Sequence, residues 1–323
     1  MFFRIGRALR ILLSLLLTAL VGVLPLQSRA QDTPSAGFFT LAGGNIDGNY
    51  FAVARGICRE VNRRHVGLLR CSPESTAGAT YNLEALHRGR VDFAIVQSDL
   101  LASARNGDGL FSTDGPVADL NGIAALYEET VIVLVGRDSG IDDLADLVGT
   151  RVDVGPQSSG RRVTLDRILA ALDLDIFSFS EVSELPAASA VDELCQDRLD
   201  AVVLIVGNPD VNVGRALGEC GAAILPLGRG PSAAKIDAME TYDRVILPAG
   251  VYPEVATPLP TFGVKAMLVT RAGTRADMVM AIADVLSRET ATLYRAAPVL
   301  KQDASHAWPE TAPVPVHTAL SPG

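Results

Sequence analysis

Motifs for catalysis and for metal binding are missing from this 323-residue sequence. It contains no G-x-S-x-G, H-E-x-x-H, Walker A or C-x-x-C motif, and its four histidines show no metal-ligand spacing. The acidic pairs Glu128-Glu129 and Asp142-Asp143 are adjacent, so the two members of a pair would not face one site on a helix. We therefore expect a protein that is not an enzyme and that holds neither a metal nor a cofactor.

Long hydrophobic runs are also lacking after the first thirty residues, so no later segment is predicted to span a bilayer. At the N-terminus, Arg4, Arg7 and Arg10 precede the apolar run 11–24, and small residues flank Arg29 at Ser28 and Ala30. This order predicts a secretory signal peptide over 1–30 that is cleaved after Ala30, and hence a periplasmic protein. A retained N-terminal anchor is the alternative, although the 14-residue run is short of the roughly 20 that span a bilayer.

Basic residues are the minority, with 28 lysines and arginines against 37 aspartates and glutamates. Cleavage would remove four arginines and no acid, which leaves 24 basic residues and a net charge of −13. A chain this acidic argues against nucleic acid and anionic membrane surfaces as partners. It does not argue against a small anionic ligand, because local backbone N–H groups can bind an anion regardless of net charge.

Cysteines are few, and their number is even: Cys58, Cys71, Cys195 and Cys220. In an oxidising compartment an even count predicts disulfides, and the pairing local in sequence is Cys58–Cys71 and Cys195–Cys220. Buried free thiols are the alternative.

What the sequence does contain is an alternation of apolar strand patterns and amphipathic helix patterns, which predicts an α/β fold. The clearest unit has an apolar run at 66–71, the polar turn Ser75 to Asn82, and a helix pattern at 83–89. The first N–H groups of a helix have no intrahelical partner, so such a turn can receive a carboxylate or phosphate without a lysine. A plain helix N-cap is the alternative interpretation of Ser75 and Thr76.

Similar polar turns follow other predicted strands in both halves of the chain. The glycine-rich turn 43–50 ends at Tyr50, and Gln97-Ser98-Asp99 follows the apolar run 91–96. In the second half, the turn 155–162 and the turn at Gly207-Asn208-Pro209 occupy equivalent positions. Ligands of open α/β sheets bind beyond the carboxyl ends of the strands, so we expect these turns to line one cleft between two similar lobes.

Together these stretches resemble the TAXI family of extracytoplasmic solute receptors, which serve TRAP-type secondary transporters. The resemblance covers about residues 38 to 290, and its most specific part is Val96-Gln97-Ser98-Asp99 in combination with the Ser75-Thr76-Ala77-Gly78 turn. The other matching stretches are Gly43-Gly44 to Tyr50-Phe51, Asp138 to Ile141, Arg151 to Gly155, Leu199 to Ala201, Gly207 to Pro209 and Pro248 to Tyr252.

The resemblance implies a type II periplasmic-binding-protein-like fold, with two α/β lobes, a ligand cleft and a hinge. It also implies that the ligand is a small carboxylate such as glutamate, glutamine, 2-oxoglutarate or a related compound. The family's binding positions correspond here to Tyr50, Ser75, Thr76, Asn82, Gln97, Ser158, Ser159 and Asn208. From the residues themselves we add Arg161 as a candidate bidentate partner for a carboxylate, with a solvated surface arginine as the alternative. Two departures from the family pattern, at Gly78-Ala79 and at Gly160-Arg161, touch the expected pocket.

We expect residues 31–131 and 248–323 to form lobe one and residues 132–247 to form lobe two. The expected function is that of a monomeric receptor that delivers its solute to a TRAP-type membrane permease. One alternative is a periplasmic sensory subunit that reports to a membrane receptor. Another is an exported hydrolase, for which Ser98 and Asp99 would be the starting point.

Overall fold

Ten strands form one mixed sheet in the computed structural model, which describes residues 37–323 except 240, 289, 302–305, 311 and 322–323. The predicted signal peptide and its cleavage site lie outside the described residues. The main strand order is β2-β1-β3-β10-β4-β7-β5-β6, with β8 paired to β4 and β9 paired to β10. The strands are β1 (Gly37–Ala42), β2 (Leu69–Glu74), β3 (Phe93–Gln97), β4 (Leu120–Val135), β5 (Arg151–Asp153), β6 (Glu181–Ser183), β7 (Ala201–Val206), β8 (Ala223–Ile224), β9 (Asp243–Leu247) and β10 (Leu259–Arg271).

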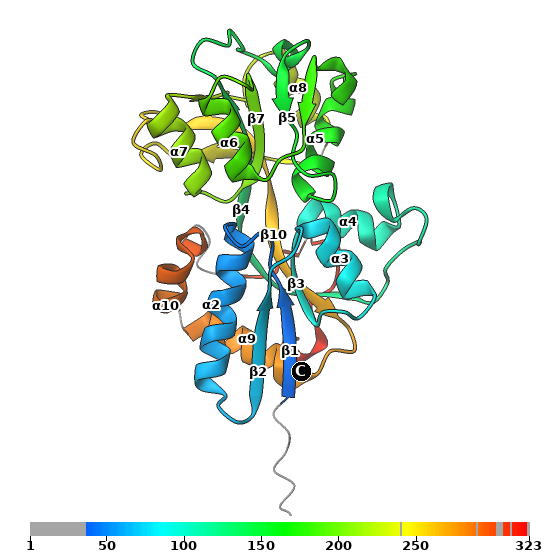
Figure 1. Ribbon diagram of the computed structural model, residues 1–323. Helices are drawn as coiled ribbons and strands as arrows, with labels where there is room; N and C mark the ends of the chain where they lie inside the picture. The colour runs from blue at the N-terminus through cyan, green and yellow to red at the C-terminus, as the bar shows by residue number, and fades with distance from the viewer. Residues whose placement is uncertain (1–36, 240, 289, 302–305, 311, 322–323) are drawn as a thin grey trace, which may run out of the picture. The chain divides into compact units, whose positions relative to one another are not determined.

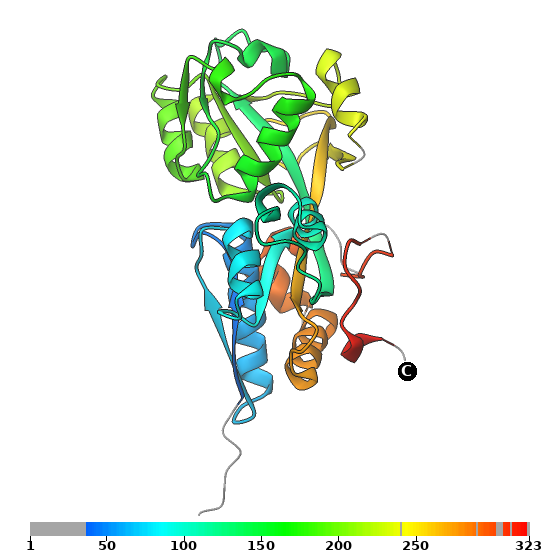
Figure 2. The same ribbon diagram turned by 90° about the vertical axis from the view of Figure 1, so that its right-hand side faces the viewer.

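Helices cover both faces of the sheet at each of its two ends (Figures 1 and 2). The α-helices are α2 (Asn49–Arg64), α3 (Ala79–His87), α4 (Ser98–Asn106), α5 (Gly160–Ala171), α6 (Ala187–Cys195), α7 (Val211–Cys220), α8 (Pro231–Asp237), α9 (Ala276–Arg288) and α10 (Thr290–Ala296). The short 3-10 helices are η1 (Gly109–Phe111), η2 (Leu144–Leu147), η3 (Ile176–Ser178), η4 (Pro298–Lys301) and η5 (Thr318–Leu320). Within the part of the chain that is described, no helix combines the length and the apolar character that crossing a bilayer requires.

The buried apolar residues form two pairs of clusters, one pair at each end of the sheet. At the end formed by β1, β2 and β3, helices α2, α9 and α10 pack on one face and α3 and α4 on the other. At the end formed by β5 and β7, helices α5 and α8 pack on one face and α6 and α7 on the other. We call these two ends the first lobe and the second lobe. Each is a three-layer α/β unit with its own core, as the sequence predicted.

The strands β4 and β10 are long enough to take part in both lobes. In the first lobe β10 pairs with β3, and in the second lobe β4 pairs with β7. The two strands pair antiparallel with each other from Thr130 to Leu120, so they form the only part of the sheet that connects the lobes among the described residues (Figure 1). A connection made of two strands is thin compared with the lobes themselves, which is the geometry of a hinge.

The return of the chain to the first lobe differs from the sequence expectation. Tyr252 and Val255 pack in the core of the second lobe, together with Leu247. Phe262 and Val264, in the first half of β10, belong to the second-lobe core as well. We therefore propose that the chain returns to the first lobe along β10 and not at residue 248, because a continuous strand carries it across.

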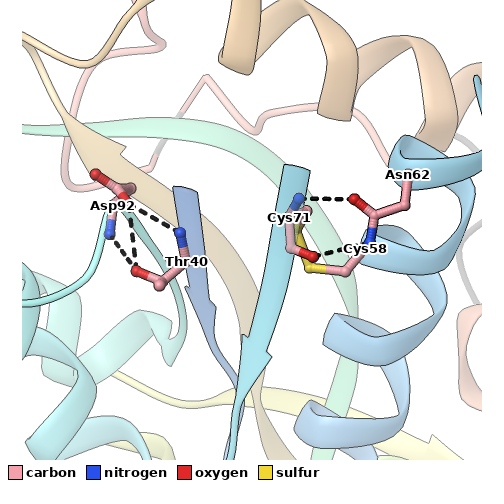
Figure 3. The surroundings of a disulfide bond; sticks show 5 residues. All are labelled: Thr40, Cys58, Asn62, Cys71 and Asp92. Atoms are coloured by element: carbon pink, nitrogen blue, oxygen red, sulfur yellow. Dashed lines mark hydrogen bonds between the residues drawn. A yellow bond between two sulfur atoms is a disulfide. The ribbon is translucent and has the colours of Figure 1, made fainter. Parts of the chain in front are cut away.

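Both disulfides predicted from the sequence are present. Cys58 on α2 is bonded to Cys71 on β2, and Cys195 on α6 is bonded to Cys220 on α7. Beside the first pair, Asn62 forms two hydrogen bonds with the backbone of Cys71, at 2.9 and 2.7 Å (Figure 3). On the other side of β1, the carboxylate of Asp92 accepts the backbone N–H of Thr40 at 2.8 Å (Figure 3). These contacts join α2 to β2, and β1 to the loop before β3.

Candidate functional site

A cavity of about 290 Å³ lies where turns from the two lobes meet. The walls come from the last residues of strands, from the turns at their carboxyl ends, from the helices that follow, and from the middle of β4. In α/β sheets this edge is where ligands bind. The lining residues that carry polar or charged side chains are Asn45, Asp47, Asn49, Tyr50, Thr76, Gln97, Glu129, Ser159, Arg161, Asp210 and Asn212.

In the first lobe, the turn after β2 is fastened to the turn after β1. The hydroxyl of Ser75 donates to the carbonyl of Gly44 at 3.1 Å, and that of Thr76 donates to the carbonyl of Gly43 at 3.0 Å. Asn82, which is fully buried, donates to the carbonyls of Gly43 and Ile95 and accepts from Thr76. These side chains hold the two turns in place, so that Thr76 and its neighbours face the cavity.

The N-terminus of α3 borders the cavity without a side-chain cap. Its N-cap residue is Gly78, whose φ of 115° lies in the range that favours glycine, and no side chain caps this helix in the described region. Gly78 and Ala79 both line the cavity. The first N–H groups of α3 are therefore available to a ligand, and the helix dipole adds partial positive charge there.

Glu129 lies at the base of the cavity, on β4. Its side chain is 5% exposed, and its Oε2 accepts a hydrogen bond of 2.6 Å from the hydroxyl of Tyr50 at the start of α2. Burial raises the pKa of Glu129 to about 8, and the nearby carboxylates of Asp99 and Glu128 act in the same direction. Burial and the charge of Glu129 also raise the pKa of Tyr50. The pair is consequently a phenol beside a carboxyl that is largely neutral at pH 7.

In the second lobe, the turn after β5 is organised by Asp153, a fully buried residue. Arg161 pairs with this carboxylate and also donates to the carbonyl of Leu185 at 3.1 Å. Ser159 caps α5, because its hydroxyl accepts the N–H of Arg162. The guanidinium of Arg161 thus lines the cavity, but its charge is balanced by Asp153.

The turn after β7 is held by Tyr252. Its hydroxyl donates to Oδ1 of Asn208 at 2.6 Å and accepts the N–H of Asp210 at 2.8 Å. Asn208 also donates to the hydroxyl of Thr130. Asp210 in turn caps α7 by accepting the N–H of Asn212, and burial raises the pKa of its carboxyl. Across the lobes, Asn49 donates to the carbonyl of Gly207 at 2.8 Å.

The nine binding residues expected from the sequence fall into two groups. Five of them line the cavity: Tyr50, Thr76, Gln97, Ser159 and Arg161. The other four are not among its lining residues. Ser75, Asn82 and Asn208 make the internal hydrogen bonds described above, and Ser158 is exposed on the turn before α5. Whether any of the nine binds a ligand remains a prediction.

The sequence reasoning did not select Asn49, Glu129 or Asp210. The signal for Asn49 and Asp210 was present, since both adjoin turns at strand ends that had been singled out. The signal for Glu129 was weaker: it is one of two adjacent glutamates in a sixteen-residue strand whose other residues are mostly apolar. A charge that interrupts a buried strand must have a local reason, because an unpaired buried charge is costly.

Two further arrangements of side chains in the described region bear on metal binding and on serine chemistry. Among the described residues, no group of three or more histidines, cysteines and acids is placed to hold a metal ion. One S-x-x-K spacing occurs on α8, but Ser232 bonds to Asp143 while Lys235 pairs with Asp173 at 2.7 Å. The lysine therefore does not serve as a base for that serine. Ser98 donates no proton to Asp99 in the observed contacts and instead accepts the N–H of Lys265 at 3.0 Å.

Comparison with known proteins agrees with this architecture. One similar structure is that of a Listeria monocytogenes protein described as an L-cystine ABC transporter, with 12% identity over 83% of this chain and 97% of that chain and a TM-score of 0.50. A Bordetella bronchiseptica RB50 protein has 18% identity over 84% and 80%, also with a TM-score of 0.50. The periplasmic aliphatic sulphonate binding protein SsuA of Escherichia coli has 19% identity over 85% and 80%, with a TM-score of 0.49.

These likenesses concern the fold. The expected fold class, a two-lobed α/β architecture of the periplasmic-binding-protein type, is confirmed. A family model, described as the NMT1-like family, matches residues 41–320. Because that match spans most of the sequence, the chain belongs to the NMT1-like family.

Proposed function

We propose that this protein is an extracytoplasmic solute receptor, without catalytic activity, that encloses a small molecule between its two lobes. The observation that carries this proposal is the cavity of about 290 Å³, whose walls come from strand-end turns of both lobes. Its size suits a small metabolite better than a polymer. The thin connection through β4 and β10 supports opening and closing of the lobes, which exchange of such a solute requires.

We propose further that the solute is a small carboxylate, of the kind of glutamate, glutamine or 2-oxoglutarate. The resemblance to the TAXI receptors supports this class. So do the uncapped N-terminus of α3 and the N-terminus of α5, which both border the cavity at Gly78 and Gly160. Helix N-termini bind carboxylates through free N–H groups.

The same resemblance supports periplasmic location and delivery to a TRAP-type permease. Closure would be the signal that the permease reads. A solute shifts the lobes toward the closed form only if it binds that form more tightly than the open one. The hydrogen bond from Asn49 to Gly207 joins the lobes beside the cavity, so opening of the lobes would break it.

The proposal is tested by thermal unfolding of the refolded mature protein with glutamate, glutamine, 2-oxoglutarate, C4-dicarboxylates and sugars. At a concentration 100 times Kd, a solute should stabilise the fold by about 2.7 kcal/mol. Gln97→Ala, which alters a lining side chain, should weaken a positive response. Gln157→Ala is the matched control, because Gln157 is exposed and does not line the cavity. Chemical turnover of a bound solute would contradict the proposal and favour a hydrolase.

A further inference from the structure

The cavity has an acidic wall that a simple anion would not match. Three carboxyl groups line it, those of Asp47, Glu129 and Asp210. The one lining cation within the described part of the chain is Arg161, and its charge is balanced by the buried Asp153. A carboxylate bound at the helix N-termini would therefore share the cavity with acidic groups that have no positive partner.

Among these acids Glu129 is the most deeply placed. Glu129 is only 5% exposed, and its side chain accepts a hydrogen bond from the hydroxyl of Tyr50. Within the described residues no lysine or arginine forms an ion pair with Glu129. Its neighbour Glu128 differs, because it is partly exposed and pairs with Lys265 at 3.1 Å. A buried carboxylate on a cavity wall, without a cation from the protein, can be completed by a cation from the solute.

Titratable groups near Glu129 come from α2, α4 and β4, and include the buried phenol of Tyr127 on β4. Tyr50 on α2 stabilises the ionised form through its hydrogen bond, whereas Asp99 on α4 and Glu128 on β4 oppose it. The charge of Asp99 is offset by Arg167 on α5, and that of Glu128 by Lys265 on β10. The largest influence is burial, which raises the pKa of Glu129 to about 8. In the free protein at pH 7 the carboxyl therefore holds its proton most of the time.

On the basis of the proposed receptor function, we propose that the solute carries a protonated nitrogen that the carboxylate of Glu129 binds, and that Glu129 releases its own proton as the solute enters. The step is an exchange of partners: the O–H bond of Glu129 breaks, the proton leaves to solvent, and the ammonium or guanidinium of the solute takes its place beside the two oxygens. No other bond is made or broken. Amino acids then bind in preference to keto acids and plain dicarboxylates of the same length.

Release of a proton from Glu129 makes solute binding depend on pH in a way that can be measured. Below the pKa of Glu129, affinity for an amine-bearing solute should rise by about tenfold for each pH unit. It should approach a plateau as the pH passes that pKa, and fall again only where the amine of the solute loses its own proton. Calorimetry at pH 7 in buffers of different ionisation enthalpy should count close to one proton released per solute bound. The probes are L-glutamate, 2-oxoglutarate and glutarate, which share two carboxylates and differ in the nitrogen. If 2-oxoglutarate or glutarate binds as tightly as L-glutamate, or if affinity for L-glutamate falls as the pH rises from about 6 to about 8, the inference is wrong.

Variants separate the role of Glu129 from general effects on the fold. Glu129→Gln keeps the shape and an acceptor for Tyr50, so it should fold, lose the proton release and lose at least tenfold in preference for the amine. Tyr50→Phe removes the hydrogen bond that lowers the pKa of Glu129, so the midpoint of the pH profile should move upward. Glu128→Gln, the same change one residue away and outside the cavity lining, should retain both the proton release and the preference.

The solute that co-purifies with the protein gives a second, independent test. Protein isolated from the periplasm without refolding is analysed by native mass spectrometry, and the bound solute is extracted and identified. A solute with a basic nitrogen supports the inference. A solute that lacks one overturns it while the receptor function stands. If the protein carries no solute and binds none of the probes, the proposed receptor function itself fails.

Discussion

Nη1 of Arg167 lies 3.2 Å from Oδ2 of Asp99, and this contact joins α5 of the second lobe to α4 of the first. The same oxygen accepts a hydrogen bond from the hydroxyl of Thr164 at 3.0 Å. Arg167 also donates to the hydroxyl of Ser103 on α4. None of these four residues lines the cavity. The lobes are thus fastened at a second place, away from the cavity.

The first prediction concerns this contact. Thr164→Val and Arg167→Met should each weaken solute binding without altering the cavity lining, because they remove bonds between the lobes that opening would break. A loss of about 1–2 kcal/mol from the closed form corresponds to a five- to thirtyfold higher Kd. Titration calorimetry measures the Kd, and small-angle scattering with saturating solute shows whether the lobes remain further apart.

Arg162→Met provides the control for that prediction. Arg162 lies on the same helix, but it pairs with Asp166 and Glu184 inside the second lobe. Its loss should leave the Kd unchanged within a factor of two or so, as expected for ion pairs that are open to solvent on one side. If Arg162→Met weakened binding as much as Arg167→Met, the effect would come from α5 itself and not from the contact between lobes.

The second prediction concerns Gly160, where the two lobes approach each other beside the cavity. A Cβ atom at Gly160, the first residue of α5, would overlap Oε1 of Gln97 and lie 3.1 Å from Cδ1 of Leu100. Gly160→Ala should therefore displace the amide of Gln97, which lines the cavity, and raise the Kd several-fold. If the amide cannot move aside, the lobes stay further apart and the radius of gyration of the solute-saturated protein increases as well. Thermal unfolding without solute should change little, because the clash disappears on opening.

Gly214→Ala is the matched change for Gly160→Ala. Gly214 lies within α7, and its nearest new contact would be Tyr252 at an ordinary 3.8 Å. Alanine should stabilise this helix by up to about 1 kcal/mol and leave solute binding alone. Equal binding by Gly160→Ala and the unaltered protein would mean that the two lobes do not need to approach at Gly160.

Part of the cavity lining could be predicted from the sequence. The rule that ligands meet strand ends brought Tyr50, Thr76, Gln97 and Ser159 to one cavity. It succeeded because alternating strand and helix patterns predict parallel strands, whose carboxyl ends lie at one edge of the sheet. The rule could not tell which side chains of a turn point outward. Ser75 and Thr76 are adjacent and chemically alike, yet only Thr76 lines the cavity, and this depends on how the turn after β1 packs against them.

The strand β4 illustrates a second limit. From the sequence, the apolar runs 122–127 and 130–135 look like two strands, because Glu128 and Glu129 interrupt them. In the structure the run is continuous, since β10 pairs with β4 across both glutamates and Lys265 neutralises Glu128. Neither the partner strand nor the lysine, more than a hundred residues away, is visible in a local pattern. Glu129 was missed for this reason.

A third prediction concerns the dependence of stability on pH. Arg151 binds the carboxylate of Asp200 through two side-chain bonds, at 2.7 and 3.1 Å, and through its backbone N–H at 2.8 Å. The hydrogen bonds from Arg151 lower the pKa of Asp200 below its value in the unfolded chain. The resulting stabilisation is therefore complete above the ordinary aspartate pKa of about 3.9 and disappears as pH falls through the lower, folded value.

Asp200→Asn should accordingly reduce the free energy of unfolding by about 0.5–1 kcal/mol at pH 7, a modest figure because both side chains are partly exposed. The difference from the unaltered protein should shrink below pH 4 and vanish near pH 2. Urea unfolding across this range measures it. Asp142→Asn, at an exposed position in the same lobe, is the control, and it should change the free energy of unfolding by no more than about 0.5 kcal/mol. A difference that stays constant with pH would mean that Asp200 acts through shape and not through charge.

The fourth prediction ranks the two disulfides. The chain-entropy model assigns each about 3 kcal/mol, with slightly more for Cys195–Cys220, because it closes 25 residues and Cys58–Cys71 closes 13. The difference in burial predicts the opposite order of stability loss when the cysteines are replaced. Cys58 and Cys71 are 1% and 2% exposed inside the first-lobe core, whereas Cys195 and Cys220 are only partly buried. Replacing the first pair by alanine therefore leaves a cavity in addition to the lost cross-link.

Urea unfolding of the two double-alanine variants should show the larger loss for Cys58→Ala/Cys71→Ala, by about 1 kcal/mol or more. Reduction of the unaltered protein removes the cross-links but leaves the sulfur atoms in place, so it creates no cavity. It therefore measures the free energy of unfolding that the cross-links alone contribute. The loss on reduction should accordingly be smaller than the loss in the alanine variant of the first pair. If removal of the second pair lowered the free energy of unfolding more, loop length would outweigh core packing. The hydrogen bonds of Asn62 to Cys71 would then be sufficient to hold α2 against β2 without the disulfide.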